Sequence, residues 1–213
     1  MLEQQVPILT CYNLLMSTFY LLRHGAKEPI PGDPPLSAQG LKQATKTAIH
    51  MKKFKFDSIY ASPFTRTKQT AAIVAEFHNL PVQIDSRLVE RMNWGDKPNQ
   101  TFENFMQEWA KTDASRTYEP SHGKSSYKSG ESIRNFITEL HSQNPKQSTL
   151  IVTHGGTIGD LLRNVFVETD LPIIADPELN TKYLEIAESS LTIIKFENGN
   201  FRSKLIGSIT HLD

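Results

Sequence analysis

Short apolar runs alternate with segments of helical spacing along this chain, and this alternation constrains its fold more than any other feature. Four runs have the length and composition of buried strands: residues 19–22, 58–61, 82–88 and 150–152. Between and after them, apolar residues recur three or four positions apart, as in helices, near residues 41–51, 64–75, 133–140 and 158–166. Strands that alternate with helices indicate a mostly parallel sheet covered on both faces. The sequence therefore predicts a three-layer α/β/α sandwich.

The end of the chain has a different pattern. Two apolar runs, residues 191–196 and 201–206, flank the turn-forming triplet Asn198-Gly199-Asn200. This arrangement is typical of a β-hairpin. We expect the hairpin to close the fold as an antiparallel element at one edge of the sheet.

The length of 213 residues suits one domain, which we place at residues 18–213, after a loosely attached extension, residues 1–17. The segment at about 90–129 breaks the alternation, and we interpret it as an inserted lid. It contains a predicted helix with Phe102, Phe105, Met106 and Trp109. For the aromatic residues of this segment, including Trp94, we expect packing within the lid in preference to a cage around a substrate.

Composition narrows the classes of protein that this chain can represent. Its 23 basic and 23 acidic residues cancel, which argues against a dedicated nucleic-acid or membrane-surface binder. Cys11 is the one cysteine, so an internal disulfide is excluded and a reducing compartment is favoured. No apolar run approaches the ~18 residues needed to span a bilayer, and the leader lacks the basic start of a signal peptide. We expect a cytoplasmic protein, and no pattern indicates its oligomeric state.

Chemically capable side chains follow three of the predicted strands. Arg23-His24-Gly25 and His154-Gly155 each come directly after a strand, and Arg66 lies just beyond the run at 58–61. Because the carboxyl ends of parallel strands meet at one edge of a sheet, these groups should converge. Arginine binds phosphate through two-pronged hydrogen bonds of about 1.5–3 kcal/mol each, and histidine supplies a nitrogen nucleophile. The pattern predicts a phosphoryl-transfer site that holds a dianion without a metal or other cofactor.

A mechanism follows from these residue types. Neutral His24 would attack phosphorus, with its other ring nitrogen held by an acceptor such as a backbone carbonyl. His154, as a cation or a donor, would stabilise the phosphoryl oxygens, and Gly25 and Gly155 would leave room for them. Glu90, where the third strand gives way to the lid, is the predicted proton donor for the leaving group.

The motifs together resemble those of the histidine phosphatase superfamily, in its phosphoglycerate mutase-like branch. The resemblance runs from about residue 18 to the final hairpin and is carried by four segments in order: Leu22-Arg23-His24-Gly25, Pro35-Leu36-Ser37-Ala38-Gln39-Gly40, Ser62-Pro63-Phe64-Thr65-Arg66-Thr67-Lys68-Gln69-Thr70-Ala71 and Val152-Thr153-His154-Gly155-Gly156. It implies that His24 is the nucleophile, that Arg23, Arg66 and His154 bind the phosphoryl group, and that Glu90 is the proton donor. Gly130-Glu131-Ser132 also resembles a family segment, which leaves Glu131 as an alternative acid.

Departures from the family pattern favour a phosphatase. Many members follow Arg-His-Gly with Glu, and mutases add a Trp-Asn, whereas this chain has Ala26-Lys27-Glu28-Pro29. Glu90-Arg91-Met92 also lacks the His-Tyr of the mutase segment. A phosphoglycerate mutase and a non-catalytic phospholigand-binding protein remain the alternatives. We expect a small phosphorylated substrate, or phosphate, with Lys27, Arg91 and Gly155 as its further contacts, although solvated charges are the ordinary reading of Lys27 and Arg91.

Overall fold

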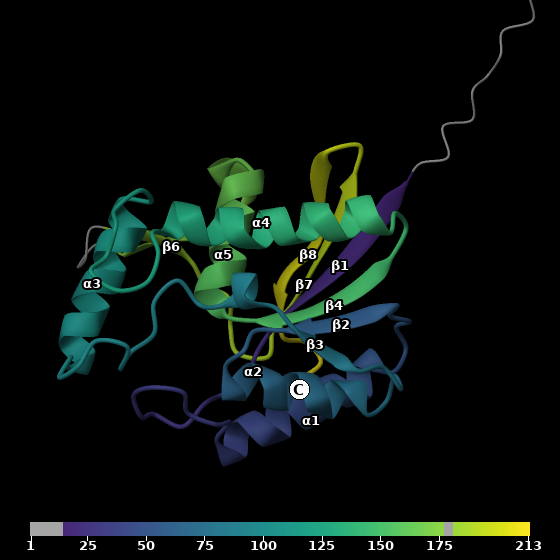
Figure 1. Ribbon diagram of the computed structural model, residues 1–213, viewed down its shortest axis with the longest axis horizontal. Helices are drawn as coiled ribbons and strands as arrows, with labels where there is room; N and C mark the ends of the chain where they lie inside the picture. Colours follow the sequence, from purple (N-terminus) through teal and green to yellow (C-terminus); the bar gives the residue numbers. More distant parts are fainter. Residues whose placement is uncertain (1–14, 177–180) are drawn as a thin grey trace, which may run out of the picture.

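The computed structural model describes residues 15–176 and 181–213, and a six-stranded sheet forms its centre (Figure 1). The strand order is β3-β2-β4-β1-β7-β8. The bounds are β1 Met16–Arg23, β2 Ser58–Ala61, β3 Val82–Ile84, β4 Ser148–Thr153, β7 Leu191–Glu197 and β8 Asn200–Ser208. β1, β2, β3 and β4 pair in parallel, whereas β7 runs antiparallel to β1, and β8 to β7. The mostly parallel sheet and its antiparallel edge are confirmed.

Helices cover both faces of the sheet, which completes the predicted three layers. α1 (Ala38–Met51) and α2 (Thr65–Ala75) lie on one face, and α4 (Ser126–Gln143) and α5 (Gly155–Val165) lie on the other (Figure 1). Because successive side chains of a strand point to opposite faces, β1 feeds both cores. Phe19 and Leu21 pack with α4 and α5, and Leu22 packs with α1 and α2. Ser37 caps α1 by accepting a hydrogen bond from the Gly40 N–H at 3.2 Å.

Three boundaries differ from the sequence expectations. The third strand ends at Ile84 because the Asp85 side chain accepts the Arg87 N–H at 2.8 Å and caps a 3-10 turn, η1 (Ser86–Leu88). α4 begins at Ser126, so the last four residues of the predicted lid are helical. β1 already begins at Met16, inside the predicted extension. The rest of that extension through residue 14, with Cys11, lies outside the described residues.

Three further elements were not predicted. β5 (Ile173–Asp176) and β6 (Thr181–Leu184) pair as a separate antiparallel ribbon, and a 3-10 turn, η2 (Glu168–Asp170), precedes them. β6 packs against α3 (Phe102–Ala114), the helix of the predicted lid (Figure 1). No helix in the described ranges is long and apolar enough to cross a membrane.

The loop after β1 is held close to α1 by two glycines. A Cβ atom on Gly25 would lie 2.6 Å from the Gly40 carbonyl oxygen, and one on Gly40 would collide with the Ala26 carbonyl. Gly25 is therefore needed for this backbone contact, which is a different reason from the room for phosphate oxygens that we expected. The contact fixes the segment that carries His24.

Candidate active site

Three neighbouring strands end at the same edge of the sheet, and each is followed by a polar side chain. Ser62 follows β2, His154 follows β4 and His24 follows β1. The strand ends stay in register because the His24 N–H donates to the Thr153 carbonyl at 3.0 Å and the Ser62 N–H to the Val152 carbonyl at 3.1 Å. The two imidazole rings lie 5.2 Å apart between centroids. The predicted convergence of these strand ends is present.

The His24 side chain is buried and held in one orientation. Its Nδ1 lies 2.7 Å from the carbonyl oxygen of Gly25, and its Nε2 accepts the Nε–H of Arg66 at 3.2 Å. Nδ1 therefore carries the proton, and Nε2 presents a lone pair. Burial, and then the charges of Arg66 and Arg23, hold the pKa of His24 well below its usual range. The ring is thus neutral and oriented as a nucleophile requires.

The lowered pKa of His24 has a measurable consequence. A depressed imidazole pKa means that the neutral form persists as the pH falls, whereas an unperturbed histidine is about nine-tenths protonated at pH 5.5. We expect the ¹⁵N chemical shifts of His24 in the ligand-free protein to report a neutral ring down to pH 5.5. The signals are assigned by their loss in His24→Ala. Titration of this ring near pH 6.5 would contradict the expectation.

Two arginines flank His24 with part of their donor capacity unused. Arg23 NH1 donates to the Ile186 carbonyl at 2.6 Å, and Arg66 NH2 donates to Asn93 Oδ1 at 3.3 Å. Arg66 is buried at the start of α2, where a cation is disfavoured by the helix dipole. Among the described residues, Arg23 Nε and Arg66 NH1 have no hydrogen-bond partner although both atoms are buried. Buried donors without partners are costly, and an anion's oxygens would satisfy them.

His154 is fully buried and contributes a third such atom. Its Nε2 lies 2.8 Å from Ser62 Oγ, while its Nδ1 has no partner within the described part of the chain. Burial, followed by the influence of His24, Arg66 and Arg23, lowers the pKa of His154 well below its usual value. Of the two states that the sequence left open, cation or neutral donor, the neutral donor fits this environment.

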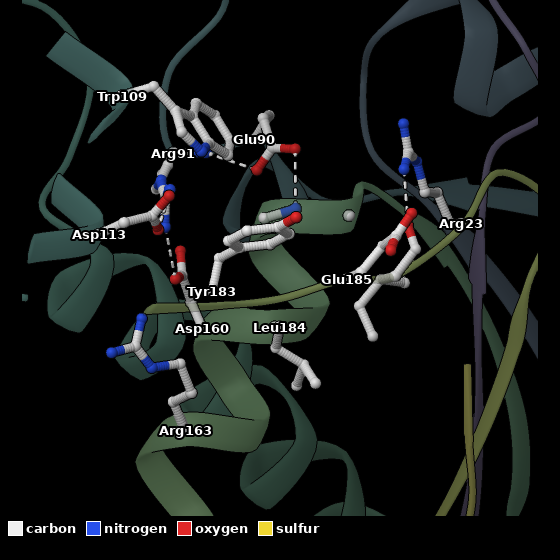
Figure 2. A pocket seen from close by; sticks show the side chains of 14 residues that line it. Arg23, Glu90, Arg91, Trp109, Asp113, Asp160, Arg163, Tyr183, Leu184 and Glu185 are labelled. Carbon is white, nitrogen blue, oxygen red and sulfur yellow. Dashed lines mark hydrogen bonds and ion pairs between the residues drawn. The ribbon is translucent and has the colours of Figure 1, made fainter. Parts of the chain in front are cut away.

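Glu90 lies at the N-terminus of α5, where the helix dipole favours a carboxylate (Figure 2). Its oxygens accept the Gly156 N–H at 3.1 Å, the Thr157 hydroxyl at 3.2 Å and the Arg91 N–H at 3.1 Å. A Cβ atom at Gly156 would collide with this carboxylate and lie 2.7 Å from the Trp109 ring. The Glu90 carboxylate can therefore occupy this position only because residue 156 has no side chain.

Glu131, the alternative acid, has other neighbours. It lies on α4, where it pairs with Arg134 at 3.2 Å and accepts the Asn164 side-chain N–H at 3.2 Å. Two cavities, described below, open beside His24 and Glu90, and Glu131 lines neither of them.

The family assignment agrees with this geometry. The sequence profile of the histidine phosphatase superfamily (branch 1) matches residues 19–208. The chain belongs to this superfamily. Similar proteins include the uncharacterized phosphatase PhoE of Bacillus subtilis (28% identical, covering 92% of this chain and 97% of that protein). The probable phosphoglycerate mutase GpmB of Escherichia fergusonii is 27% identical and covers 93% of this chain and 96% of its own.

The solved structure of Bacillus stearothermophilus YhfR shares the fold of this superfamily member. It superposes with a TM-score of 0.73 at 23% sequence identity, over 92% of this chain and all of the other. The resemblance stated from the motifs is therefore confirmed at the level of the family and of the fold.

In this histidine phosphatase superfamily member, Arg91 is bound by two aspartates. Its NH1 donates to Asp160 of α5 at 2.8 Å and its NH2 to Asp113 of α3 at 2.6 Å, and its guanidinium lies 3.8 Å from the centre of the Trp109 ring (Figure 2). Burial raises the pKa of Asp160 to about 6, although Arg91 opposes that shift. Arg91 is buried by these contacts, which tie α3 to α5. The substrate contact expected of its guanidinium therefore has no support in this geometry.

Two cavities meet at Arg23, Glu90 and Trp109. The aromatic cavity, of about 220 Å³, contains His24, Arg66 and Lys27 and is walled by Trp94, Phe102, Phe105, Met106 and Trp109. The Tyr183 cavity, of about 260 Å³, lies between the N-terminus of α5, where Gly155 and Gly156 line it, and β6 (Figure 2). The aromatic rings pack against one another within the lid, as expected, and they also line a cavity beside His24.

Several site residues were missed at the sequence level. Asn93 holds Arg66, Glu188 faces Arg23 at 3.7 Å between Oε1 and NH2, and Tyr183 lines the second cavity. None of them belongs to a recognisable motif, since each reaches the site from a loop or from the unpredicted ribbon. Within residues 15–176 and 181–213, no cluster of three or more histidine, cysteine, aspartate or glutamate side chains has the arrangement of a metal site.

Proposed function

We propose that this protein is a metal-independent phosphatase that hydrolyses a small phosphate monoester through a phosphohistidine on His24. One observation carries the proposal: the Nε2 of a neutral His24, which accepts a hydrogen bond from the Arg66 Nε–H, lies among buried donors that lack hydrogen-bond partners. These are Arg23 Nε, Arg66 NH1 and the Nδ1 of His154. A phosphoryl group supplies the acceptors that these donors need, and it places phosphorus in front of the imidazole.

Binding comes first. The phosphoryl oxygens accept from Arg23, Arg66 and His154, and the N-terminus of α5, which begins at Gly155, adds to the positive potential. Charge-assisted hydrogen bonds of this kind contribute about 1.5–3 kcal/mol each. A neutral His154 can donate a hydrogen bond from Nδ1 to the phosphoryl group without first becoming protonated.

The first chemical step forms the phosphoenzyme. The lone pair on His24 Nε2 attacks phosphorus as the bond between phosphorus and the ester oxygen breaks. The leaving alkoxide takes a proton from Glu90, which acts as the general acid in this step. The Gly25 carbonyl stabilises the imidazolium character that develops on the ring, because it accepts the Nδ1 proton.

The second step restores the enzyme. Glu90, now a carboxylate, accepts a proton from a water molecule that attacks the phosphohistidine. The bond between phosphorus and Nε2 breaks, the electron pair returns to His24, and inorganic phosphate leaves. We assign Arg91 no contact with substrate in this cycle, because both aspartates already hold its guanidinium. Lys27, on the wall of the aromatic cavity, remains a proposed contact.

A substrate panel tests the proposal. We expect release of inorganic phosphate from small phosphate monoesters, at a rate unchanged by a metal chelator. Restoration of lost activity by added metal would contradict metal independence. Phosphate binding without hydrolysis of any ester would support the non-catalytic alternative.

Phosphoglycerate mutase activity is the second candidate, favoured by the similarity to a probable mutase. Isomerisation of phosphoglycerates that is faster than their hydrolysis would select it.

A further inference from the structure

One face of α3 is apolar and is turned toward the aromatic cavity. Phe102, Phe105, Met106 and Trp109 recur at helical spacing and all line that cavity. The buried residues of this fully described helix are Thr112 and Asp113, near its end. Phe102 remains 55% exposed and Met106 38% exposed. Because core-packing side chains would be buried, this face is not part of the packed core, and it forms an exposed apolar patch beside the cavity.

The aromatic rings form a continuous surface. Trp94 lies 5.2 Å from Phe102 between ring centroids, Phe102 lies 6.2 Å from Phe105, and Phe105 lies 5.8 Å from Trp109. These spacings are typical of interacting aromatic pairs. The surface is also anchored, because Arg91 covers the Trp109 ring and bonds Asp113 on the same helix. A ligand would therefore meet a preformed wall.

The charges around the wall are few and nearly balanced. Of the three cations that line this cavity, Arg23 and Arg66 are assigned to the phosphoryl group, which leaves Lys27. Glu188 also lines the cavity, near both Arg23 and Lys27. Burial, and then the charge of Arg66, lower the pKa of Lys27. A carboxylate on a substrate would approach Glu188 and an apolar surface, with one cation to offset them.

We propose that the aromatic cavity selects phosphate monoesters with an uncharged, planar aromatic leaving group, and that Glu188 disfavours leaving groups that carry a carboxylate. The aromatic group lies against Phe102, Phe105 and Trp94 while the phosphoryl group lies at His24. This inference rests on the proposed function, since it assumes that the phosphoryl group binds there.

Esters with similar alkyl oxygen leaving groups test the inference without large differences in intrinsic reactivity. We expect kcat/KM for 2-phenylethyl phosphate to exceed that for ethyl phosphate and for 3-phosphoglycerate by at least about tenfold, since contact with the aromatic wall removes the apolar surface of the phenyl ring from water. Equal kcat/KM values for the three esters would overturn the inference and leave the proposed function intact. Failure to hydrolyse any ester would overturn the proposed function itself.

A double variant and a control variant test whether the side chains of the aromatic wall determine this selectivity. Phe102→Ala combined with Met106→Ala should lower the ratio of kcat/KM for 2-phenylethyl phosphate to that for ethyl phosphate by at least fivefold. Phe77→Ala, which removes an exposed ring outside the cavity, is the matched control and should keep the ratio. An unchanged ratio in the double variant would contradict the role of the wall. The wild-type comparison stands even if the double variant fails to fold.

Glu188→Gln should raise the ratio of kcat/KM for 3-phosphoglycerate to that for ethyl phosphate by at least threefold, because the repulsion of a carboxylate is removed. Glu119→Gln, at an exposed glutamate that lines neither cavity, is its control. An unchanged or lower ratio in Glu188→Gln would overturn the part assigned to Glu188.

Discussion

We expect replacement of His24 with alanine to lower the turnover of every phosphate monoester by roughly 10⁴-fold or more. Losses of this size are seen when a covalent nucleophile is removed. The reason is structural: Nε2 of His24 is the neutral nitrogen that Arg66 and the Gly25 carbonyl orient. Rapid quenching with ³²P-labelled substrate should show a phosphoenzyme in the wild type that is labile in acid and stable in base. The alanine variant should show none.

The matched control for this experiment is His122→Ala, which removes an exposed histidine that lines neither cavity. Phosphate binding to His24→Ala should survive, because the donors on Arg23 and Arg66 remain in place. A labelled phosphoenzyme in the alanine variant, or a label with the acid stability of a phosphoester, would refute the assignment of the nucleophile.

The second large effect concerns the proton that the leaving group needs. Glu90→Gln should slow phosphoenzyme formation from an alkyl phosphate by about 10²–10⁴-fold, the usual contribution of general acid catalysis. The same step with p-nitrophenyl phosphate should slow far less, because p-nitrophenolate leaves without a proton. Glutamine keeps the size of the side chain beside Gly156 and Trp109. Single-turnover rapid quench isolates this step from the later hydrolysis.

Glu131→Gln is the natural comparison, since Glu131 is the other acid that the sequence suggested. Its pairing with Arg134 and Asn164 predicts little effect on phosphoenzyme formation from either ester. If Glu90→Gln slows both esters equally, then Glu90 positions other groups and does not donate the proton. If Glu131→Gln reproduces the leaving-group dependence, the assignment of the acid is reversed.

The fold was predictable because its signals are local. Buried parallel strands such as β1 and β4 are short apolar runs, and α1 has both its Ser37 cap and its apolar spacing in the sequence. The convergence of His24, Arg66 and His154 followed from the general property that parallel strands end together. The length of β3 was not predictable from apolar composition, because the Asp85 cap interrupts a run that is otherwise suited to a strand.

The surroundings of His24 were harder to predict from the sequence. The β5 and β6 ribbon forms outside the main sheet, and its pairing is not encoded in a strong alternation of residues. Whether the apolar face of α3 packs inward or lines a cavity depends on where the helix docks. That position is set by the contacts of Arg91 with Asp113 and Asp160. Such a contact joins three segments far apart in the chain, so no single motif reveals it.

Gly156 lies between the Glu90 carboxylate and the Trp109 ring, so its lack of a side chain affects the position of both groups. The space that any Cβ atom would fill there is taken by the Glu90 carboxylate on one side and the Trp109 indole on the other. An alanine at this position would push the acid and the aromatic wall apart together. The positions of the Glu90 carboxylate and of the Trp109 ring are therefore coupled through residue 156, and a side chain there cannot shift one without disturbing the other.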